Sequence, residues 1–321
     1  MNDQAIGRRI FLTAAAAAAV AGALDATAGH AQQAVPNTTG TGPARVKAPP
    51  NAADCHMHIY DPRFAESNPR PGQNPKNATV SDYRLLQKRT GTVRVVVVQP
   101  RNYATDNRVT MDALRQLGAS ARGVAVVHPD ITDAELKSLD DAGIRGIRFS
   151  LGGANAVTTW DMVEPLSRRV NERGWHVQFN VDGEDISAHA DLLRRLPSRM
   201  VFDHLGHPPL PAGIDDPSHK VLRGLLDQGR TWIKLSGAYS DSKAGPPDYP
   251  EATRTAQAFV KAAPERLVWG SDWPHPSEQN GTLPDDALLF DLLSVWASDE
   301  ATRKRILVDN PENLYGFAKS A

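Results

Sequence analysis

The sequence contains a single cysteine among 321 residues and almost no net charge. One cysteine cannot form an internal disulfide, so the chain is not a small scaffold held together by disulfide bonds. The 36 lysines and arginines nearly balance the 37 aspartates and glutamates, and the formal net charge is −1. This balance provides no global field for binding nucleic acid or an anionic membrane. We therefore expect a globular protein that binds a small molecule and no nucleic acid.

Three common catalytic or cofactor motifs are also absent from the sequence. It has no Gly-x-Ser-x-Gly elbow of a serine hydrolase, no glycine-rich phosphate loop and no dinucleotide fingerprint. The one thiol, that of Cys55, is expected to point away from the candidate pocket and to pack against a helix, because side chains alternate along a strand. This argues against a cysteine nucleophile.

Long apolar runs are scarce, and the clearest one lies near the N-terminus. Arg8 and Arg9 precede Ile-Phe-Leu, and an alanine-rich segment, Ala14–Leu24, leads to small residues typical of a cleavage site. The pattern predicts an export signal over residues 1–31 that resembles a twin-arginine leader. A membrane anchor is the alternative, but the run is shorter than the roughly 20 residues that span a bilayer. We expect cleavage, a periplasmic location and no stable membrane anchor afterwards.

The composition changes after the predicted leader. Residues 32–50 are rich in Pro, Gly, Thr, Asn and Gln and show no apolar period, which predicts a flexible linker. Residues 51–321 remain for folding, and their number, about 270, is typical of one α/β barrel.

Eight short runs rich in Val, Ile, Phe or Trp predict eight strands in this region. They are Ala53–Ile59, Val93–Gln99, Gly123–His128, Ile144–Ser150, His176–Val181, Met200–His204, Thr231–Ser236 and Leu267–Ser271. Helical patterns separate them, several ending at Gly or Pro, which are helix stop signals. The predicted helices are Val109–Leu117, Asp133–Asp141, Asp161–Arg173, Ile186–Leu196, Lys220–Asp227, Ala252–Ala263 and Asp285–Ala297. Eight such repeats favour a single-domain (β/α)8 TIM barrel over a doubly wound open sheet.

Polar side chains gather where the predicted strands end, which is the catalytic face of such a barrel. Asp54, His56 and His58 alternate along the first strand and are expected to share one face. Later strands carry further polar groups: Arg148, Gln178, Asn180, Asp203, His204, Lys234, Ser236 and Asp272. The first and last strands are neighbours in a closed barrel, so His56 and His58 can meet Asp272.

Each of these residues also has a purely structural interpretation. The His-x-His pair can be ordinary strand surface, His204 a core histidine and Arg148 a surface ion-pair partner. Asp54 and Asp203 can orient histidine tautomers without contacting a substrate. The segment Trp273–Pro276 can be a rigid loop that closes over the site. The convergence of the whole set at one barrel mouth is what favours a catalytic site.

Four motifs resemble those of the amidohydrolase superfamily. They are Asp54-Cys55-His56-Met57-His58, Arg145-Gly146-Ile147-Arg148-Phe149, Asp203-His204-Leu205-Gly206-His207-Pro208 and Trp269-Gly270-Ser271-Asp272-Trp273-Pro274-His275-Pro276. The chain is most similar to the amidohydrolase-related branch of lactonases, which includes pyrone-dicarboxylate lactonase, sugar-acid lactonases and D-galactarolactone isomerase. The ending Leu307–Tyr315 fits the same branch, and the resemblance spans residues 50–317.

The resemblance implies a hydrolase that opens a lactone of a sugar acid or an aromatic-derived acid by water attack. It implies that Asp272 is the general base and that His56, His58 and His204 line the pocket and hold or polarise the substrate. Arg148 is implied to bind near the reacting carbonyl. The candidate substrate-binding residues are Arg148, Gln178, Asn180, Ser236, Tyr239 and His275.

This chain departs from the pattern of its relatives in two ways. Ala154 and Ser240 stand where the pyrone-dicarboxylate enzyme has arginines, and Asn180 where it has a tyrosine, which argues against a doubly anionic pyrone. The isomerase branch has neutral residues in place of His56 and Asp272, and both are present here, which favours hydrolysis.

The same residues raise the question of a metal. His56, His58, His204 and Asp272 suit one Zn²⁺ or Mn²⁺ with an open water position. The resemblance to lactonases favours action without a required cofactor. A metal-dependent amide hydrolase or decarboxylase is the nearest alternative function, and a lactone isomerase or a non-catalytic sugar-acid binding protein is more distant.

Overall fold

A computed structural model describes residues 34–152, 156–240 and 242–320. The predicted export signal, residues 1–31, lies outside the described residues. Residues from Gln33 onward form one compact unit. Among the helices of the described part, none has the length and apolar character to cross a membrane.

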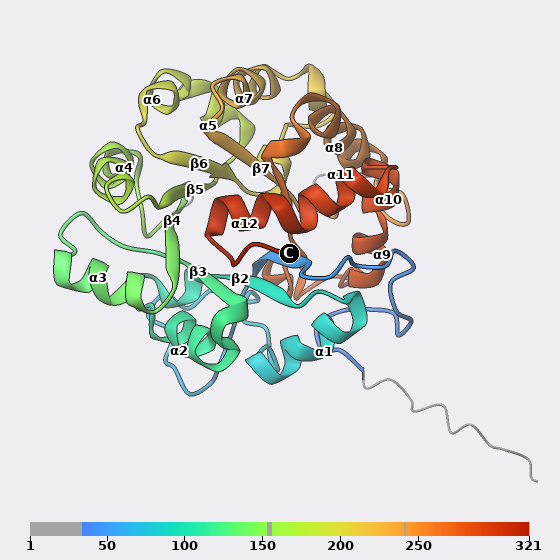
Figure 1. Ribbon diagram of the computed structural model, residues 1–321, viewed down its shortest axis with the longest axis horizontal. Coiled ribbons are helices and arrows are strands. Elements are labelled where there is room, and N and C mark those ends of the chain that lie inside the picture. Colours follow the sequence, from blue (N-terminus) through green and yellow to red (C-terminus); the bar gives the residue numbers. More distant parts are fainter. Residues whose placement is uncertain (1–33, 153–155, 241, 321) are drawn as a thin grey trace, which may run out of the picture. The chain divides into compact units, whose positions relative to one another are not determined.

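Eight parallel strands run in chain order around one sheet (Figure 1). They are β1 (Ala53–Met57), β2 (Arg94–Val98), β3 (Ala121–Ala125), β4 (Ile144–Ser150), β5 (His176–Asn180), β6 (Arg199–Phe202), β7 (Thr231–Leu235) and β8 (Leu267–Trp269). Each strand pairs with the next, from β1–β2 through β7–β8. The predicted TIM barrel is confirmed.

Backbone contacts just beyond β8 bring the barrel nearly to closure. Met57 and Trp273 form an isolated parallel bridge. The amide of Asp272 donates to the carbonyl of His56 at 2.7 Å, and the amide of His58 donates to the carbonyl of Trp273 at 2.8 Å. The segment that follows β8 is therefore fixed directly against the end of β1, as expected for the first and last strands of a barrel.

Helices surround the sheet in the alternating order that the sequence predicts. The structure has α1 (Val80–Thr90), α2 (Arg108–Leu117), α3 (Asp133–Asp141), α4 (Val163–Asn171), α5 (Gly183–Ala188), α6 (Ala190–Arg195), α7 (Pro217–Asp227), α8 (Pro250–Ala262), α9 (Asp286–Asp291), α10 (Leu293–Trp296), α11 (Glu300–Lys304) and α12 (Asn310–Tyr315). Thr132 begins α3 with a capping box to Glu135, and Asp216 caps α7 ahead of a proline at its first position.

Two apolar clusters make up the core. The larger one lies between the strands and the surrounding helices, and the smaller one fills the interior of the barrel. Leu314, Tyr315 and Phe317, from α12 and the residues after it, belong to the interior cluster. Figure 1 looks at this end, where α12 lies across the strands. The amino ends of the strands are thus covered by apolar side chains, and the polar cluster lies at the other end.

The prediction for Cys55 was wrong about the face of the strand, although Cys55 stays out of the cavity as expected. Its side chain belongs to the interior cluster with Val96, Val98 and Trp232, and does not lie on the outer face of β1. The pairing of β1 with β2 shifts register between Asp54 and Met57, which is the signature of a bulge or similar irregularity. Strict alternation fails there, so Cys55 lies inside the barrel. It does not line the cavity described below.

Residues 34–50 lie along the barrel in the structure, which differs from the flexible linker that their composition predicts. The indole nitrogen of Trp273 donates to the carbonyl of Pro36 at 2.8 Å. The amide of Arg45 donates to Asp291 at 2.7 Å. The compact unit therefore begins well before β1.

Candidate active site

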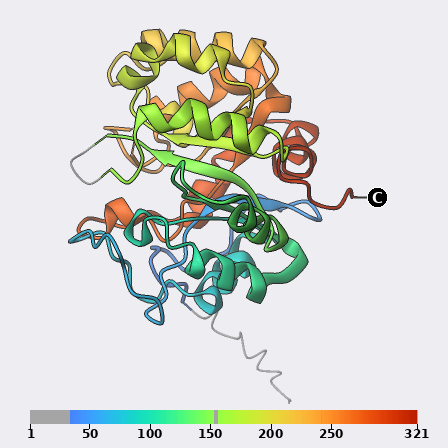
Figure 2. The same ribbon diagram turned by 90° about the vertical axis from the view of Figure 1, so that its left-hand side faces the viewer.

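A cavity of about 190 Å³ opens at the carboxyl ends of the strands. Figure 2 shows this end on the left, opposite the C-terminus. The residues around the cavity come from the carboxyl ends of β4 and β5 and from the segments after β1, β2, β6, β7 and β8. They are His58, Tyr60, Arg70, Gln73, Pro100, Arg101, Asn102, Arg148, Asn180, His204, His207, Ser240, Asp272, Pro276 and Ser277. The volume suits a small organic molecule.

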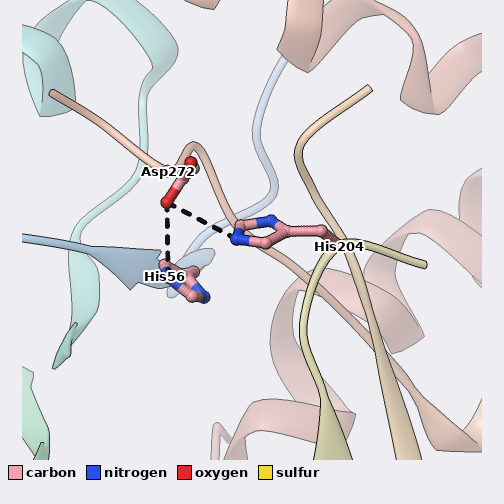
Figure 3. Close-up of side chains that lie close together, drawn as sticks. All are labelled: His56, His204 and Asp272. Atoms are coloured by element: carbon pink, nitrogen blue, oxygen red, sulfur yellow. Dashed lines mark ion pairs between the residues drawn. The ribbon is translucent and has the colours of Figure 1, made fainter. Parts of the chain in front are cut away.

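Three histidines surround one oxygen of Asp272 at the base of the cavity, and Figure 3 shows two of them, His56 and His204. The Oδ1 atom lies 3.3 Å from Nε2 of His56, 3.3 Å from Nε2 of His58 and 3.8 Å from Nε2 of His204. The other carboxylate oxygen accepts a hydrogen bond from the hydroxyl of Tyr239. The predicted catalytic residues therefore meet in space, although they come from three separate strand ends.

Unusual backbone geometry presents two of these residues. His204 and Asp272 both have left-handed backbone conformations, with φ of 48° and 61°. Aspartate and histidine tolerate this region better than most residues, and such conformations concentrate at functional sites. Short turns hold them, because the amide of His207 donates to His204 at 3.0 Å and the amide of His275 donates to Asp272 at 2.8 Å.

Two glycines make room for the histidines. A Cβ atom on Gly270 would lie 2.5 Å from the Cβ of His56, and one on Gly237 would lie 2.7 Å from Nδ1 of His204. Any larger residue would displace the imidazoles, because real Cβ atoms do not approach other atoms this closely. The segments directly after β7 and β8 are therefore part of the site's geometry.

A buried network of charges lies beneath His56. Asp203 accepts from Nε of Arg148 at 3.0 Å and from the amide of Gln178 at 3.1 Å. Its other oxygen lies 3.1 Å from Nδ1 of His56 and 3.4 Å from Nζ of Lys234. Lys234 is fully buried, donates to Gln178 at 2.8 Å and lies 3.1 Å from Nδ1 of His56. The network fixes the orientation of His56 and Arg148 from below.

Hydrogen-bond partners determine which nitrogen of His58 carries the proton. Nδ1 of His58 lies 2.8 Å from the carbonyl oxygen of Val98, which can only accept. Neutral His58 therefore presents the lone pair of Nε2, which lies 3.2 Å from Nε2 of His56. His56 can donate Nε2–H to it and accept from Lys234 at Nδ1. This assignment gives every ring nitrogen of the pair a protein partner.

Burial keeps His56 and His204 neutral, whereas neighbouring groups keep Asp272 ionised. Burial lowers the pKa of His204 to about 4, although the charge of Asp272 opposes the shift. Burial, reinforced by the charge of Lys234, lowers the pKa of His56 well below its usual value. Burial alone would raise the pKa of Asp272, but the interactions with His204, His58 and His56 outweigh burial and hold that pKa well below its usual value. At neutral pH the site therefore holds an ionised Asp272 beside neutral His56 and His204.

Asp54 performs a different role from the histidines on the same strand. It accepts from the hydroxyl of Tyr83 on α1 at 3.0 Å, and from the amide and hydroxyl of Ser271 at 2.9 and 2.6 Å. Burial raises the pKa of Asp54 to about 6. It joins β1 to the segment after β8 and does not line the cavity.

Of the predicted substrate-binding residues, Arg148 and Asn180 line the cavity and four others lie behind it. Gln178 belongs to the buried charge network. Ser236 lies 2.9 Å from Nδ1 of His204. Tyr239 contacts Asp272, and His275 lies 3.1 Å from the hydroxyl of Tyr239 and 3.1 Å from Asp286. These four residues orient the groups that face the cavity.

The same cluster can hold a metal ion. Ligand atoms of His56, His204 and Asp272 all lie within 4.8 Å of one another, and all three residues are buried. If His56 carried its proton on Nδ1, toward Asp203, its Nε2 lone pair and that of His58 would both face the space beside Asp272. A carboxylate behind a ligating histidine is the usual arrangement around zinc. The residues fit one divalent ion. The arrangements with and without a metal would differ in which ring nitrogen of His56 carries the proton.

Several cavity residues carry no signal in the sequence pattern. Tyr60, Arg70 and Arg101 come from loops after β1 and β2, where no periodicity marks them. His207 lies three residues after His204 and lines the same cavity. Lys234 shares the inward face of β7 with Ser236, and its alternation places it in the barrel, but only the structure shows its contacts with His56 and Asp203.

Comparison with known proteins gives consistent matches over the barrel. The family model described as Amidohydrolase matches residues 53–317. A 4-sulfomuconolactone hydrolase of Rhizobium radiobacter is 34% identical over 85% of this chain and 93% of its own length. A 2-pyrone-4,6-dicarboxylate hydrolase of Comamonas testosteroni is 34% identical over 84% and 91%. A D-galactarolactone isomerase of Agrobacterium fabrum is 33% identical over 83% and 91%.

A solved structure agrees in fold. An apo protein from Agrobacterium tumefaciens superposes with a TM-score of 0.79 at 30% identity, covering 88% of this chain and 99% of that one. The resemblance drawn from the four motifs is therefore confirmed, both by sequence along most of the chain and by the arrangement of the barrel.

Proposed function

The chain belongs to the amidohydrolase family, and from this premise we propose that it is a hydrolase that opens a lactone of an organic acid. Water attacks the acyl carbon, with Asp272 as general base. Curated relatives at 34% identity are lactone hydrolases, which supports the reaction class. The observation that carries the proposal is the ionised Asp272 carboxylate at the base of a small cavity, ringed by three histidines.

Each group at the base of the cavity has a part in this reaction. Asp272 orients the attacking water and takes its proton. His204, neutral at pH 7 and lining the cavity, can pass a proton to the leaving oxygen once Asp272 has received one. Arg148 is fixed through Nε by Asp203, so the remaining guanidinium nitrogens can stabilise the oxyanion that develops on the carbonyl.

We propose that a lactone is opened without an obligatory metal. An activated ester has an electrophilic carbonyl, and the assignment of protons described above satisfies the histidine nitrogens within the protein. The alternative is one zinc or manganese ion held by His56, His58, His204 and Asp272. When bound, such an ion would supply a Lewis acid and acidify a water. An obligate metal requirement would favour a metal-dependent amide hydrolase or decarboxylase.

Hydrolysis is proposed over isomerisation. A relative of similar identity is a lactone isomerase, so overall similarity does not distinguish the two reactions. The presence of both His56 and Asp272 supports hydrolysis, because a base beside an imidazole can activate water. Product analysis by NMR separates the two, since hydrolysis gives an open-chain acid and isomerisation a second lactone.

A panel of lactones tests the proposal. Aldonolactones, muconolactones and pyrone carboxylates are offered to purified protein, and acid release is recorded before and after chelation of metals. We expect acid release from at least one member, retained in metal-free protein. Acid release that vanishes on chelation and returns only with zinc or manganese would support the metal-dependent alternative.

We also propose that the protein is exported to the periplasm by its twin-arginine-type leader. The support is the Arg8-Arg9 pair followed by the alanine-rich segment. Replacing both arginines by lysine should leave the precursor in the cytoplasm, which fractionation of cells will show. Unchanged delivery to the periplasm would contradict this proposal.

A further inference from the structure

Two arginines at the cavity lack a carboxylate partner, unlike Arg148. Arg70, in the loop between β1 and α1, and Arg101, directly after β2, both line the cavity. Among the described residues, neither has an acidic oxygen within 4 Å, whereas Arg148 is paired with Asp203. The one carboxylate that lines the cavity, Asp272, is already surrounded by three histidines and Tyr239. The cavity therefore has an excess of positive charge.

The protein holds these two cations in place. Nε of Arg70 donates to the side chain of Gln73 at 2.8 Å. The carbonyl of Gln73 accepts from the amide of Asn102 at 3.1 Å, and Asn102 is the neighbour of Arg101 in the chain. Arg101 itself donates to the carbonyl of Gly152 at 3.4 Å. A loop that carries one guanidinium is thus fastened to the segment that carries the other.

Arg70 and Arg101 are partly buried, and their electrostatics favour an anionic ligand. The Nη1 atom of Arg70 is buried and has no hydrogen-bond partner in the described residues, which is costly for a charged donor. Burial, together with the nearby charges of Arg70 and Arg148, lowers the pKa of Arg101 to about 10. Folding has brought like charges together and left a buried donor of Arg70 unused. Both features cost free energy, and a bound anion would offset that cost.

We propose that Arg70 and Arg101 form a second anion subsite, which binds a carboxylate or sulfonate on the substrate while Arg148 serves the reacting carbonyl. The substrate class is then a lactone with an anionic group remote from the scissile ester. Only the identification of the ligand as a lactone rests on the proposed function, and the anion subsite itself does not.

Binding of stable ring acids tests the subsite without any turnover. Benzoate, isophthalate and 3-sulfobenzoate are titrated into the full barrel domain by calorimetry, in wild type and in Arg70→Gln and Arg101→Gln variants. We expect isophthalate, 3-sulfobenzoate or both to bind at least 10-fold more tightly than benzoate. Each variant should lose about 10- to 100-fold of that affinity, the range for one charge-assisted hydrogen bond. The better of the two diacids identifies the second group.

Arg63→Gln is the matched control. Arg63 lies in the same loop, does not line the cavity and is already paired with Asp61 and Asp112 at 2.6 Å. Its replacement should leave the affinities unchanged. Diacid binding no tighter than benzoate, or variants that bind the diacids as wild type does, would overturn the subsite. Lack of turnover with every lactone, together with arginine-dependent diacid binding, would instead refute the proposed function and leave the subsite standing.

Discussion

Replacing Asp203 by asparagine should destabilise the barrel strongly, although Asp203 does not line the cavity. Its carboxylate is fully buried and faces two buried cations, Arg148 at 3.0 Å and Lys234 at 3.4 Å. Asp203→Asn leaves both cations buried without their counter-charge. Breaking a buried ion pair from one side costs about 3–5 kcal/mol. At about 2 °C per kcal/mol for a domain of this size, the melting temperature should fall by roughly 6–10 °C.

The assay is urea and thermal unfolding followed by circular dichroism. The control is Asp141→Asn, which removes an ion pair to Lys137 that is more than half exposed on both sides. Such a pair contributes at most about 1 kcal/mol. Adding Lys234→Met to Asp203→Asn removes one of the unpaired cations and should recover part of the loss. A loss for Asp203→Asn no larger than that for Asp141→Asn would refute the reasoning.

Two further predictions concern groups that are not themselves reactive. Gly270→Ala should lower kcat by about 10-fold or more, because the new Cβ would lie 2.5 Å from the Cβ of His56 and displace the imidazole from its catalytic position. Steady-state kinetics on the preferred lactone measures this change. An unchanged kcat would contradict the idea that His56 must be held in place. Burial, with the charge of Lys234, lowers the pKa of His176 to about 3 in the folded state. As the pH falls through about 6.5 the unfolded chain takes up a proton that the folded chain does not, so stability declines, by about 2 kcal/mol for this group between pH 7 and pH 5. His176→Phe should remove that part of the decline in urea unfolding, and an identical pH dependence in the variant would contradict it.

The fold was predictable because its signals are local. Each strand is a short apolar run, most helices end at a glycine or proline, and eight such units leave few arrangements. The helix Val80–Thr90 was missed, and the ends of several strands were placed one or two residues too far. Residues such as Asp203 and His204 follow β6 directly, and their polar character does not reveal where the strand hydrogen bonds stop.

The residues at the base of the cavity could be predicted from the sequence, whereas those around its opening could not. His56, His58, His204 and Asp272 follow from their places at strand ends and from the adjacency of the first and last strands in a closed barrel, although alternation wrongly put Asp54 on the face of the histidines. Gln178 and Asn180 share a face, but they lie at different depths along the barrel, so only Asn180 reaches the cavity. Depth depends on the stagger of the strands, which no single strand encodes.

The register shift in β1 and the loop arginines depend on long-range contacts. Cys55 turns inward because the pairing with β2 slips between Asp54 and Met57. Arg70 and Arg101 line the same cavity, and their segments are joined by the hydrogen bond from Asn102 to the carbonyl of Gln73, 29 positions away. Such contacts have no periodic signature in the sequence, so only the structure shows that Arg70 and Arg101 line the cavity.

The most direct test of the account is the rate of lactone opening by the Asp272→Asn variant in metal-free protein, with substrate affinity measured in parallel. The variant keeps the shape of the side chain and removes the base, so kcat should fall by about 100- to 10,000-fold while the substrate still binds. Asp141→Asn, on an exposed helix face, should leave the rate unchanged. A kcat within a few-fold of wild type would contradict Asp272 as the general base, and with it the proposed mechanism.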